Sequence, residues 1–413
     1  MVIKRRLLNG VIQHLKKKEI SLLVGPRQAG KTTLMAQMQD HLKGKGEAPL
    51  FFSLDFERDM PYFVSQKALL DKIRLEFGLH KGYVFIDEIQ RKENAGIFLK
   101  GLYDMNTPYK FIVSGSGSLE LKERVHESLS GRKRMFALNT LSFQEFINHK
   151  TEYKYEDRLD NYFEINKTEG QSLLVEYLNF GGYPRVVLEE TLREKLMTMD
   201  EIYRSYIDKD IGCLLRVERI DAFGNMIRFL AAQAGNLVNQ NELSSTLGIS
   251  VQTVKNYIAY AEKTFVISRL TPYFRNIRTE TSKSPIIYFN DIGLRNFSIG
   301  QFGGAVRLAD MGFLFQNLIY LLLCERDGHE GSTLHFWRTK DKAEVDFIIN
   351  RGDEPVPIEV KCKEVKVKTI GRSLKGFLNK YRPKEAWVVN LTLEDEEKIG
   401  DTVVRYLPFY KLL

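Results

Sequence analysis

The chain has 413 residues, of which 43% are hydrophobic and 28% charged, and its formal net charge is +8. This composition is typical of a globular protein, and the length exceeds what one hydrophobic core serves well, so we expect several domains. No apolar stretch is long enough to cross a bilayer, the N-terminus lacks the apolar core of a secretory signal, and three widely spaced cysteines argue against a disulfide framework or a zinc site. We therefore expect a cytoplasmic protein without a membrane segment, whose charge permits but does not require a nucleic acid partner.

A phosphate-binding loop is the first motif along the chain. The stretch "GPRQAGKT", residues 25–32, fits GxxxxGK[ST] and stands between an apolar, strand-like segment and a segment with apolar residues at helical spacing. Backbone N–H groups of such a loop wrap a β-phosphate, while Lys31 can bridge the β- and γ-phosphates and the Thr32 hydroxyl can bind Mg²⁺. The alternative is a glycine turn that holds no ligand. We expect ATP to contact Gly25, Pro26, Arg27, Gln28, Ala29, Gly30, Lys31, Thr32 and Thr33.

An acidic pair follows a second apolar strand, "GYVFIDEIQR". Asp87 stands where a magnesium-bound water can be held, and Glu88 stands where a carboxylate can polarise the attacking water. An acidic pair after an apolar strand is common by chance, but its combination with the phosphate-binding loop is specific. The two motifs together therefore predict ATP hydrolysis and not binding alone.

A third strand, "YKFIVSGSGS", ends in small hydroxylic residues. In a doubly wound sheet such a strand lies beside the other two, with its tip near the γ-phosphate. Either Ser114 or Ser116 could sense that group, and the alternative is a serine–glycine turn without a role. The segment "FFSLDFERD" is expected to be a further parallel strand, with Asp55 at its carboxyl end and no assigned task.

In its order of motifs the chain resembles prokaryotic AAA-family P-loop ATPases with an uncharacterised C-terminal domain, which are relatives of the signal-transducing and archaeal P-loop ATPases. The resemblance runs nearly from end to end. The segments that carry it are "GPRQAGKTTL", "VFIDEIQR", "IVSGSGS", "LSGRKRMFALNTLSFQEF", "FGGYPRVV", "YRSYIDKDI", "LSSTLGISVQTVKNYI" and "SPIIYFNDIGL".

The resemblance implies two further contacts to ATP. Arg132 of "LSGR" would contact the γ-phosphate, either in cis or across a subunit boundary, and the second case would imply a homo-oligomer. Pro184 of "GGYP" would pack on the adenine ring from a helical lid. The alternatives are a surface arginine in a basic run and a plain turn between helices.

Residues 236–270 are typical of a winged helix-turn-helix. Ser244 and Gly248 stand four apart, as the small residue and the turn glycine do in that motif, and Ser250 would cap the second helix, with Val254 and Ile258 facing the core. In one interpretation, side chains of the second helix reach a DNA groove. In the other, which we favour, the module packs or docks a protein, because the helix has only one basic residue and a DNA reader neutralises several phosphates. The side chains concerned are Gln252, Thr253, Lys255 and Asn256.

Two carboxylates and a lysine are expected to converge near the C-terminus. The segments "AEVDFIIN" and "PVPIEVKC" alternate like strands, and a turn centred on Gly352 and Asp353 would set Asp346 opposite Glu359, with Lys361 on the same face as Glu359. This D-x(12)-ExK arrangement resembles a restriction-endonuclease-like core and could hold Mg²⁺ for phosphodiester cleavage. Many such proteins have a glutamate on the preceding helix, where this chain has Gln316. A basic run then follows, "KCKEVKVKTIGRSLK", which could track a nucleic acid backbone or be a solvated face.

These observations predict an α/β protein of four parts: a P-loop NTPase core of the AAA+ or signal-transducing type over 1–160, a helical lid over 161–220, a winged helix-turn-helix over 221–290, and a restriction-endonuclease-like α/β domain over 291–413. The leading hypothesis is an ATP-hydrolysing switch that uses Mg²⁺ and acts on its C-terminal domains or on DNA. The alternatives are an ATP-regulated, magnesium-dependent nuclease and a docking module for an unidentified protein or nucleic acid, with a slow ATPase.

Overall fold

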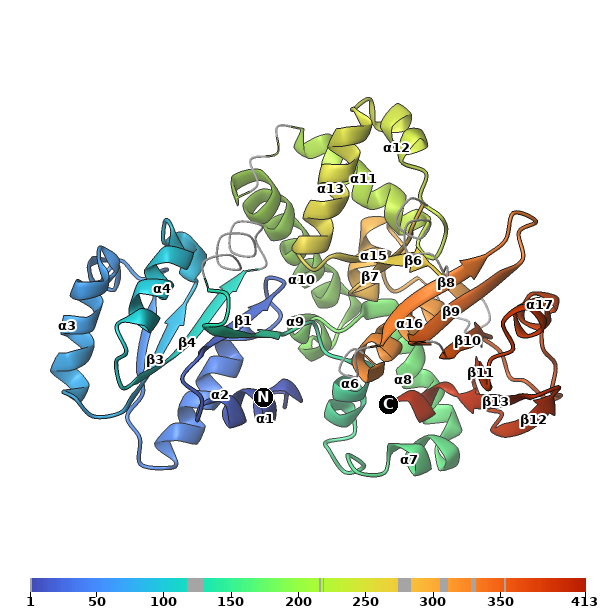
Figure 1. Cartoon of the computed structure of the whole chain (residues 1–413), viewed down its shortest axis with the longest axis horizontal. Helices are drawn as coiled ribbons and strands as arrows, with labels where there is room; N and C mark the ends of the chain where they lie inside the picture. The colour runs from blue at the N-terminus through green and yellow to red at the C-terminus, as the bar shows by residue number, and fades with distance from the viewer. Residues whose placement is uncertain are drawn as a thin grey trace.

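The computed structural model describes residues 2–116, 129–214, 217, 219–273, 284–304, 311–327, 332–352 and 354–413. Figure 1 shows the N-terminal lobe, with strands β1, β3 and β4, separated from a larger lobe that contains the middle and C-terminal parts of the chain. No described helix combines the length and the apolar character that a bilayer crossing needs.

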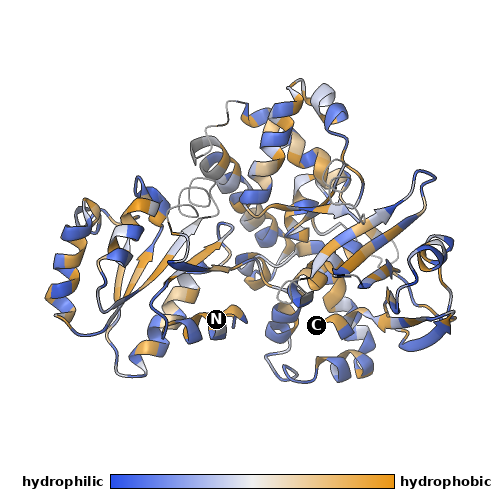
Figure 2. Cartoon of the chain, in the orientation of Figure 1, coloured by the Kyte–Doolittle hydropathy of each residue, from blue (hydrophilic) through white to orange (hydrophobic). Residues whose placement is uncertain are grey.

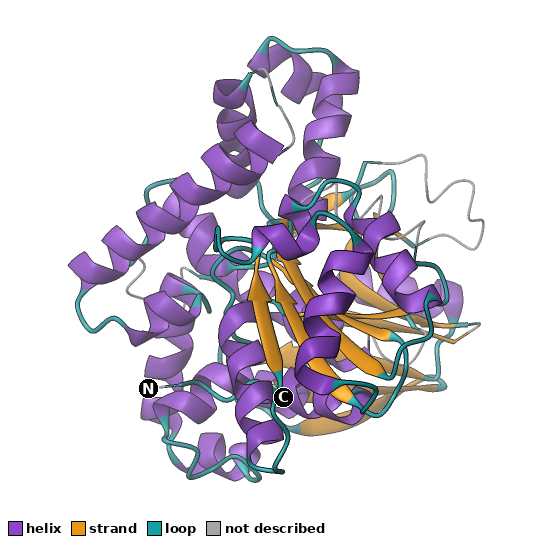
Figure 3. Ribbon diagram, turned by 90° about the vertical axis from the view of Figure 1, so that its left-hand side faces the viewer, coloured by secondary structure: helices purple, strands orange, loops and turns teal. Residues whose placement is uncertain are grey.

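The N-terminal lobe is a parallel sheet covered by helices on both faces (Figure 3). Within the described residues its strand order is β2-β3-β4-β1-β5, and each neighbouring pair is parallel. The strands and helices of this lobe are α1 Leu7–His14, β1 Ile20–Gly25, α2 Lys31–Lys43, β2 Leu50–Ser53, η1 Met60–Phe63, α3 Gln66–Phe77, β3 Gly82–Asp87, η2 Ile89–Arg91, α4 Ala95–Asp104, β4 Tyr109–Ser116 and β5 Lys133–Ala137. The predicted parallel α/β core is thereby confirmed, including the position of β4 between β1 and β3.

Side chains of this sheet alternate between two hydrophobic cores. Leu22 and Val24 of β1 belong to the core that includes α3 and α4, whereas Leu23 belongs to the core that includes α1 and α2. Both faces of a parallel sheet are covered in this way, which explains why every residue of β1 and β3 is buried and why these strands are mostly apolar (Figure 2). Asp87 ends β3 and Ser116 ends β4, so both stand at the carboxyl edge of the sheet, where the strands leave it.

Helices dominate the middle of the chain. They are α6 Phe143–Lys150, α7 Leu159–Ile165, α8 Lys167–Phe180, α9 Pro184–Leu188, α10 Leu192–Ser205, η3 Tyr206–Leu214, α11 Ile220–Ala232, α12 Gln240–Leu247, α13 Val251–Lys263 and α15 Ile292–Ser298. Two helices, α12 and α13, occupy the segment predicted as a helix-turn-helix. Gly248 ends α12 with a φ of 61°, the Ser250 hydroxyl accepts a hydrogen bond of 3.0 Å from the backbone N–H of Thr253, and Val254 and Ile258 are buried.

A second sheet joins this middle region to the C-terminus. Within the described residues its order is β12-β13-β11-β10-β9-β8-β6-β7, and β6 pairs both with β7 and with β8. Its strands and the remaining helices are β6 Ile267–Pro272, β7 Ile286–Phe289, α16 Gly312–Asp327, β8 Thr333–Arg338, β9 Glu344–Arg351, β10 Glu354–Val360, α17 Arg372–Tyr381, β11 Glu385–Asn390, β12 Asp395–Ile399, β13 Thr402–Pro408 and η5 Phe409–Leu412.

The hydrophobic cores divide the chain differently from the expected boundaries. Phe143 and Phe146 of α6 pack with Tyr177 of α8, and Phe143 also contacts Phe409 near the C-terminus. These aromatic side chains share one core with the second sheet. Helices α6, α7 and α8 were expected in the ATPase core and the lid, but their apolar faces are buried against the C-terminal part of the chain.

Candidate nucleotide-binding site

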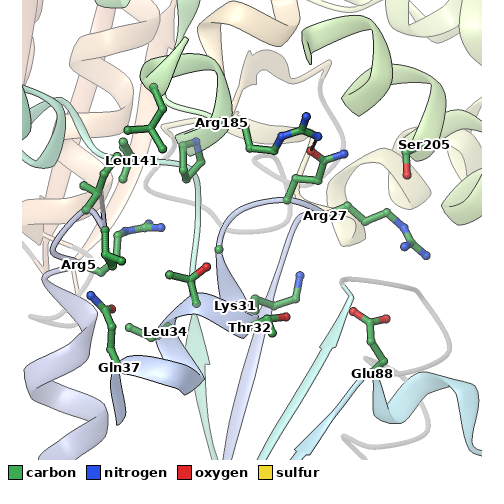
Figure 4. Close-up of a pocket in the computed structure, with 17 residues that line it drawn as sticks. Arg5, Arg27, Lys31, Thr32, Leu34, Gln37, Glu88, Leu141, Arg185 and Ser205 are labelled. Carbon is green, nitrogen blue, oxygen red and sulfur yellow. Dashed lines mark hydrogen bonds between the residues drawn. The ribbon is translucent and has the colours of Figure 1, made fainter. Parts of the chain in front are cut away.

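A cavity of about 620 Å³ opens at the carboxyl ends of β1 and β3. Figure 4 shows Lys31 and Thr32 in its middle, with Leu141 to one side and Glu88 to the other. One set of lining side chains is apolar, namely Val2, Ile3, Leu141, Pro184 and Leu188. A cavity that combines an apolar wall with a polar, phosphate-binding loop matches a nucleotide, which has a flat base at one end and charged phosphates at the other.

Two glycines of the phosphate-binding loop, Gly25 and Gly30, are required for different reasons. A Cβ atom on Gly25 would lie 2.0 Å from the carbonyl oxygen of Leu138, so no side chain fits there. Gly30 has a φ of 95° and precedes the first residue of α2, which puts the N-terminus of that helix at the cavity. The Lys31 ammonium donates hydrogen bonds to the carbonyl oxygens of Gly25, at 3.1 Å, and Pro26, at 2.8 Å. Lys31 is therefore folded over the loop, where phosphate oxygens would compete for it.

Asp87 at the end of β3 is the centre of a hydroxyl–carboxylate cluster. The Thr32 hydroxyl donates to Asp87 Oδ2 at 2.8 Å, and the Ser114 hydroxyl of β4 donates to Asp87 Oδ1. Magnesium prefers oxygen ligands and keeps several of its waters, so a threonine hydroxyl with a neighbouring carboxylate fits this ion. Two serines were candidates for this site, and Ser114 is the one whose side chain contacts Asp87. The backbone of Ser116 ends β4 beside Gly25, and its side chain lies outside the described part of the structure.

Glu88 follows β3 in a left-handed conformation, with a φ of 57°. Such a backbone is unfavourable for a residue with a side chain, by roughly 1 kcal/mol, and is often kept at functional positions. It allows the carboxylate to line the same cavity as Lys31. Burial raises the pKa of Glu88, and the positive charge of Lys31 opposes this shift. Gln90 donates its side-chain amide to Glu88 Oε2, which holds the carboxylate in place.

Two arginines at the cavity were missed at the sequence level. Arg5 is buried, donates to the carbonyl oxygen of Ala29 at 2.7 Å and pairs with Glu145 at 3.1 Å. Arg185, next to Pro184, donates to the side-chain oxygen of Gln28 at 3.1 Å. Arg5 stands in an unremarkable basic run, so no sequence signal marks it. The position of Arg185 directly after "GGYP" was a usable signal, because its neighbour Pro184 was expected at the cavity.

Arg132 lies away from the cavity, and its expected contact to the γ-phosphate in cis is not supported. It precedes β5, whose first residue Lys133 pairs with Ile20 at the beginning of β1. The phosphate-binding loop follows the other end of β1, roughly 16 Å away at 3.3 Å per residue. Arg132 instead pairs with Asp104 at 2.7 Å. The sequence motif could not reveal which edge of the sheet its arginine would occupy.

In the helix-turn-helix, Gln252, Lys255 and Asn256 of α13 are exposed. Gln252 donates to the side-chain oxygen of Asn256 at 3.1 Å, and the Thr253 hydroxyl contacts Ser250 at 2.8 Å. Their proposed contact to DNA stays a prediction.

The C-terminal carboxylates are brought together in the predicted register. Strands β9 and β10 pair antiparallel, with Ile358 opposite Phe347, so the next position along the ladder sets Glu359 opposite Asp346. Asp353, one of the two expected turn residues, lies outside the described residues. Lys361 Nζ is 3.7 Å from Glu359 Oε1. The expected hairpin geometry is thus confirmed, although its catalytic use stays a prediction.

Asp346 accepts a hydrogen bond at each of its two carboxylate oxygens. It accepts hydrogen bonds from the backbone N–H of Val360 at 2.7 Å and from the Gln316 amide at 2.8 Å. Burial raises the pKa of Asp346 to about 7, with the negative charge of Glu359 as a further cause. Among the residues that the structure describes, no cluster of three or more acidic, histidine or cysteine side chains is placed to hold a metal. Gln316 occupies the position at which an acid would have completed such a cluster.

Comparison with protein families divides the chain into three consecutive stretches. Residues 17–147 match the AAA domain family, residues 171–303 match a domain of unknown function (DUF8612), and residues 311–412 match a second domain of unknown function (DUF4143). The first stretch contains the phosphate-binding loop, Asp87 and Glu88.

Similar proteins occur in bacteria and archaea. An uncharacterized protein of Haemophilus influenzae is 27% identical over 371 residues, which are 87% of this chain and 86% of that protein. An uncharacterized protein of Methanocaldococcus jannaschii is 26% identical over 430 aligned residues, which cover 99% of this chain and 91% of that protein. Among solved structures, the replication initiator DnaA bound to AMPPCP and single-stranded DNA covers 62% of this chain and 88% of its own, at 17% identity and a TM-score of 0.28. The chain thus combines an N-terminal stretch that matches the AAA domain family with a C-terminal stretch that matches a domain of unknown function (DUF4143).

Proposed function

We propose that the chain binds ATP with Mg²⁺, hydrolyses it, and uses the nucleotide state to change the packing of its C-terminal half. Glu88 carries this proposal, because its carboxylate lines the same cavity as Lys31 and Thr32. A site that only binds phosphate does not need a half-buried carboxylate such as that of Glu88, because a carboxylate repels phosphate. A carboxylate there has a use if it accepts a proton from an attacking water.

Four polar residues at the cavity have a task in this scheme. Lys31 binds the phosphate oxygens, and Thr32 with Asp87 would hold Mg²⁺, which neutralises charge on the phosphates when bound. Glu88 orients water and takes its proton, for which a pKa raised by burial is suitable. The apolar wall that includes Leu141 and Pro184 would take the base.

The link to the C-terminal half follows from the same apolar wall. Leu141 directly precedes the capped start of α6, and Pro184 is the first residue of α9. Helix α6 shares its core with the second sheet, so a base that pushes on Leu141 acts on an element packed against the C-terminal domain. Nucleotide exchange could in this way be read outside the ATPase core.

The test is the substitution Glu88→Gln, which keeps the size of the side chain and removes its ability to take a proton. We expect ATP affinity to stay within about threefold and the hydrolysis rate to fall by about 10²-fold or more, as for other general bases. Glu93→Gln is the matched control, since Glu93 is an exposed glutamate five positions further on. Retained hydrolysis in the Glu88 variant would remove this residue from its role.

A magnesium-dependent nuclease is a second candidate function. It is favoured by the pairing of Asp346 with Glu359 and by the 3.7 Å contact between Glu359 and Lys361. Two carboxylates with a lysine could hold Mg²⁺ and orient a water at a phosphodiester. The test incubates the wild type and Lys361→Ala with plasmid and single-stranded DNA in Mg²⁺ or Mn²⁺. We expect cleavage only by the wild type, and a wild type that never cuts defeats this candidate.

A docking module for nucleic acid or protein is the third candidate, supported by the exposed polar face of α13. ATP hydrolysis measured with and without duplex and single-stranded DNA, at low and moderate salt, separates these cases. A several-fold stimulation that salt weakens would couple the cavity to nucleic acid. Unchanged hydrolysis would favour a protein partner.

A further inference from the structure

Three distant segments meet beside the apolar wall of the cavity. They are residues 140–141 after β5, the turn 181–184 between α8 and α9, and residues 291–293 at the start of α15. We refer to this meeting point as the three-segment junction. It joins the ATPase core to elements of the middle region, and the motif "SPIIYFNDIGL", which the ATPase site does not use, supplies its third segment.

Asp291 is the centre of the junction. Its Oδ2 accepts a hydrogen bond of 2.8 Å from the backbone N–H of Gly182, and its Oδ1 accepts one of 2.8 Å from the backbone N–H of Leu294. The backbone N–H of Gly293 and the side chain of Thr140 also stabilise the charged form of this carboxylate and so oppose the rise of its pKa. Asp291 is only 4% exposed. One buried carboxylate therefore joins the turn before α9 to the start of α15, and Gly182, which donates to it, also accepts a hydrogen bond from the backbone N–H of Leu141.

The backbones at the junction are too close for side chains. A Cβ atom on Gly182 would lie 2.2 Å from the carbonyl oxygen of Leu141, and one on Gly293 would lie 2.0 Å from that of Phe180. Leu141 is also held at both of its backbone polar groups. Its N–H donates to Gly182 O at 2.7 Å, and its carbonyl oxygen accepts from the Tyr177 hydroxyl at 2.8 Å. A shift of any one segment must therefore move the other two.

The junction also forms part of the cavity wall. Leu141 lines the cavity and belongs to the junction, and Pro184 lines the cavity two residues after Gly182. Asp291 itself does not line the cavity, so it can act on a ligand only through these two residues. On its other side, Asp291 caps α15, whose Leu294 is buried in the core around the helix-turn-helix.

A carboxylate at position 291 is costly, because burial disfavours its charged form. Burial raises the pKa of Asp291 to about 6, while the hydrogen bonds from Gly182 and Leu294 oppose this shift. A serine or asparagine could cap α15 without that penalty. Neither could accept hydrogen bonds from several backbone N–H groups of different segments at two oxygens, as a carboxylate does. The residue therefore suits the junction better than it suits a simple helix cap.

We propose that Asp291 is a positioning residue of the nucleotide site, which fixes Leu141 and Pro184 against the base and couples nucleotide binding to α15. This inference rests on the proposed binding of ATP in the cavity. By reciprocity, a nucleotide that binds more tightly to the intact junction also stabilises the junction, and with it the start of α15.

The first test is Asp291→Asn in the full chain, with Asp401→Asn in an exposed turn as the matched control. Asparagine has one acceptor oxygen, and its NH₂ group would face the N–H of Gly182 or of Leu294. We expect ATP binding, measured by titration calorimetry, to weaken about tenfold and KM to rise accordingly. We expect kcat to change by less than twofold, because Lys31, Thr32 and Glu88 are untouched. A folded variant with the ATP affinity of the wild type would overturn the proposal, even if its melting temperature were lower.

The second test uses Tyr177→Phe, which removes only the hydrogen bond to Leu141 and keeps the aromatic packing. We expect a loss of ATP affinity of about threefold. Hydrogen exchange at the backbone amides of Gly182 and Leu294 should slow when ATP is added to the wild type, and less so in the variant. Unchanged affinity in this variant, with no effect of ATP on either amide in the wild type, would overturn the proposal if Asp291→Asn does not fold.

The two proposals fail in distinguishable ways. A wild type that binds ATP without hydrolysing it would contradict the ATPase function and leave the test of Asp291 valid. A wild type that does not bind ATP would overturn both. ATP hydrolysis with full affinity in the folded Asp291 variant would overturn only the positioning role.

Discussion

The hydroxyl of Thr32 lies 2.8 Å from a carboxylate oxygen of Asp87, although the two residues are 55 positions apart. The fold brings them together because β1 and β3 are parallel and end at the same edge of the sheet. Each residue alone is an ordinary polar side chain, and their contact is what makes a magnesium site chemically reasonable.

Removing either partner should abolish the effect of Mg²⁺ on ATP binding. We expect the wild type to bind ATP at least about tenfold more tightly with Mg²⁺ than with EDTA, and Thr32→Val and Asp87→Asn to bind equally under both conditions. Titration calorimetry with ATP measures this difference. Thr168→Val, an exposed threonine of α8, is the control and should behave like the wild type. A Thr32 variant that still responds to Mg²⁺ would contradict this assignment.

Arg132→Ala distinguishes a role in cis from a role across a subunit boundary. Its ion pair with Asp104 is exposed to solvent, which screens it, so the stability of the chain should hardly change. We expect the hydrolysis rate per molecule to be that of the wild type in dilute solution. A loss of rate that appears only as protein concentration rises would place Arg132 at a subunit boundary. If the rate is lost in dilute solution, where the chain sediments as a monomer, Arg132 must move into the cavity during the reaction.

Gly182→Ala tests how tightly the three-segment junction is packed. A methyl group at this position would lie 2.2 Å from the carbonyl oxygen of Leu141, and overpacking of this kind destabilises by about 1 to 3 kcal/mol. Gly376→Ala is the matched control, because nothing lies within 4 Å of that position in α17. Alanine is a better helix former than glycine, so the control should be more stable by about 0.5 to 1 kcal/mol. Urea unfolding measures both, and equal effects of the two substitutions would contradict the close approach.

The buried carboxyl of Asp291 should make stability depend on pH in a defined direction. Its pKa is raised from 3.8 to about 6 in the folded chain, so the folded state holds a proton that the unfolded state releases between these pH values. Stability therefore falls as pH rises from about 4 to 6, by about 3 kcal/mol in total, and the loss is complete above pH 6. Asp291→Asn cannot titrate. The unfolding free energy of the variant minus that of the wild type should thus increase over this window, whatever constant difference the lost hydrogen bonds add. A difference that does not vary with pH would contradict the burial of an ionisable group.

Gln316→Glu should convert the C-terminal carboxylates into a metal site. The new carboxylate would lie against Asp346, where the Gln316 amide now donates a hydrogen bond of 2.8 Å. Like charges at this distance should lower the melting temperature without metal, and Mg²⁺ or Mn²⁺ should restore it. Gln13→Glu, on the exposed face of α1, is the control and should not respond to metal. A Gln316 variant that is indifferent to both ions would show that the carboxylates of β9 and β10 do not converge on one point.

The features that could be predicted from the sequence are those defined by residues close together in the chain. The phosphate-binding loop needs only the spacing of Gly25, Gly30 and Lys31, and the pairing of Asp346 with Glu359 follows from one tight turn. Position along a strand also predicts which edge of the sheet a residue reaches, so Asp87 and Glu88 could be placed at the loop.

The features that could not be predicted depend on contacts between distant segments. Arg5 reaches the carbonyl oxygen of Ala29, and Asp291 reaches Gly182 over 109 positions, but neither residue belongs to a local pattern that announces such a partner. The position of Arg132 was not predictable because a basic run is equally suited to either edge of a sheet. The sequence also could not predict which part of the chain α6 and α8 pack against. An amphipathic pattern shows that a helix has a buried face, but it does not show what covers that face.

The pairing of β6 with β8 has a practical consequence for cutting the chain into pieces. The family boundaries suggest a fragment that ends at residue 303, but such a fragment would keep β6 and lose β8. The free edge of β6 would then expose unpaired backbone groups, and the apolar faces of α6 and α8 would lose the C-terminal partners that cover them. Exposed strand edges next to uncovered apolar surface are templates for aggregation. Shortened forms of this protein should therefore be cut near residue 140, before α6, so that the whole second sheet remains in one piece.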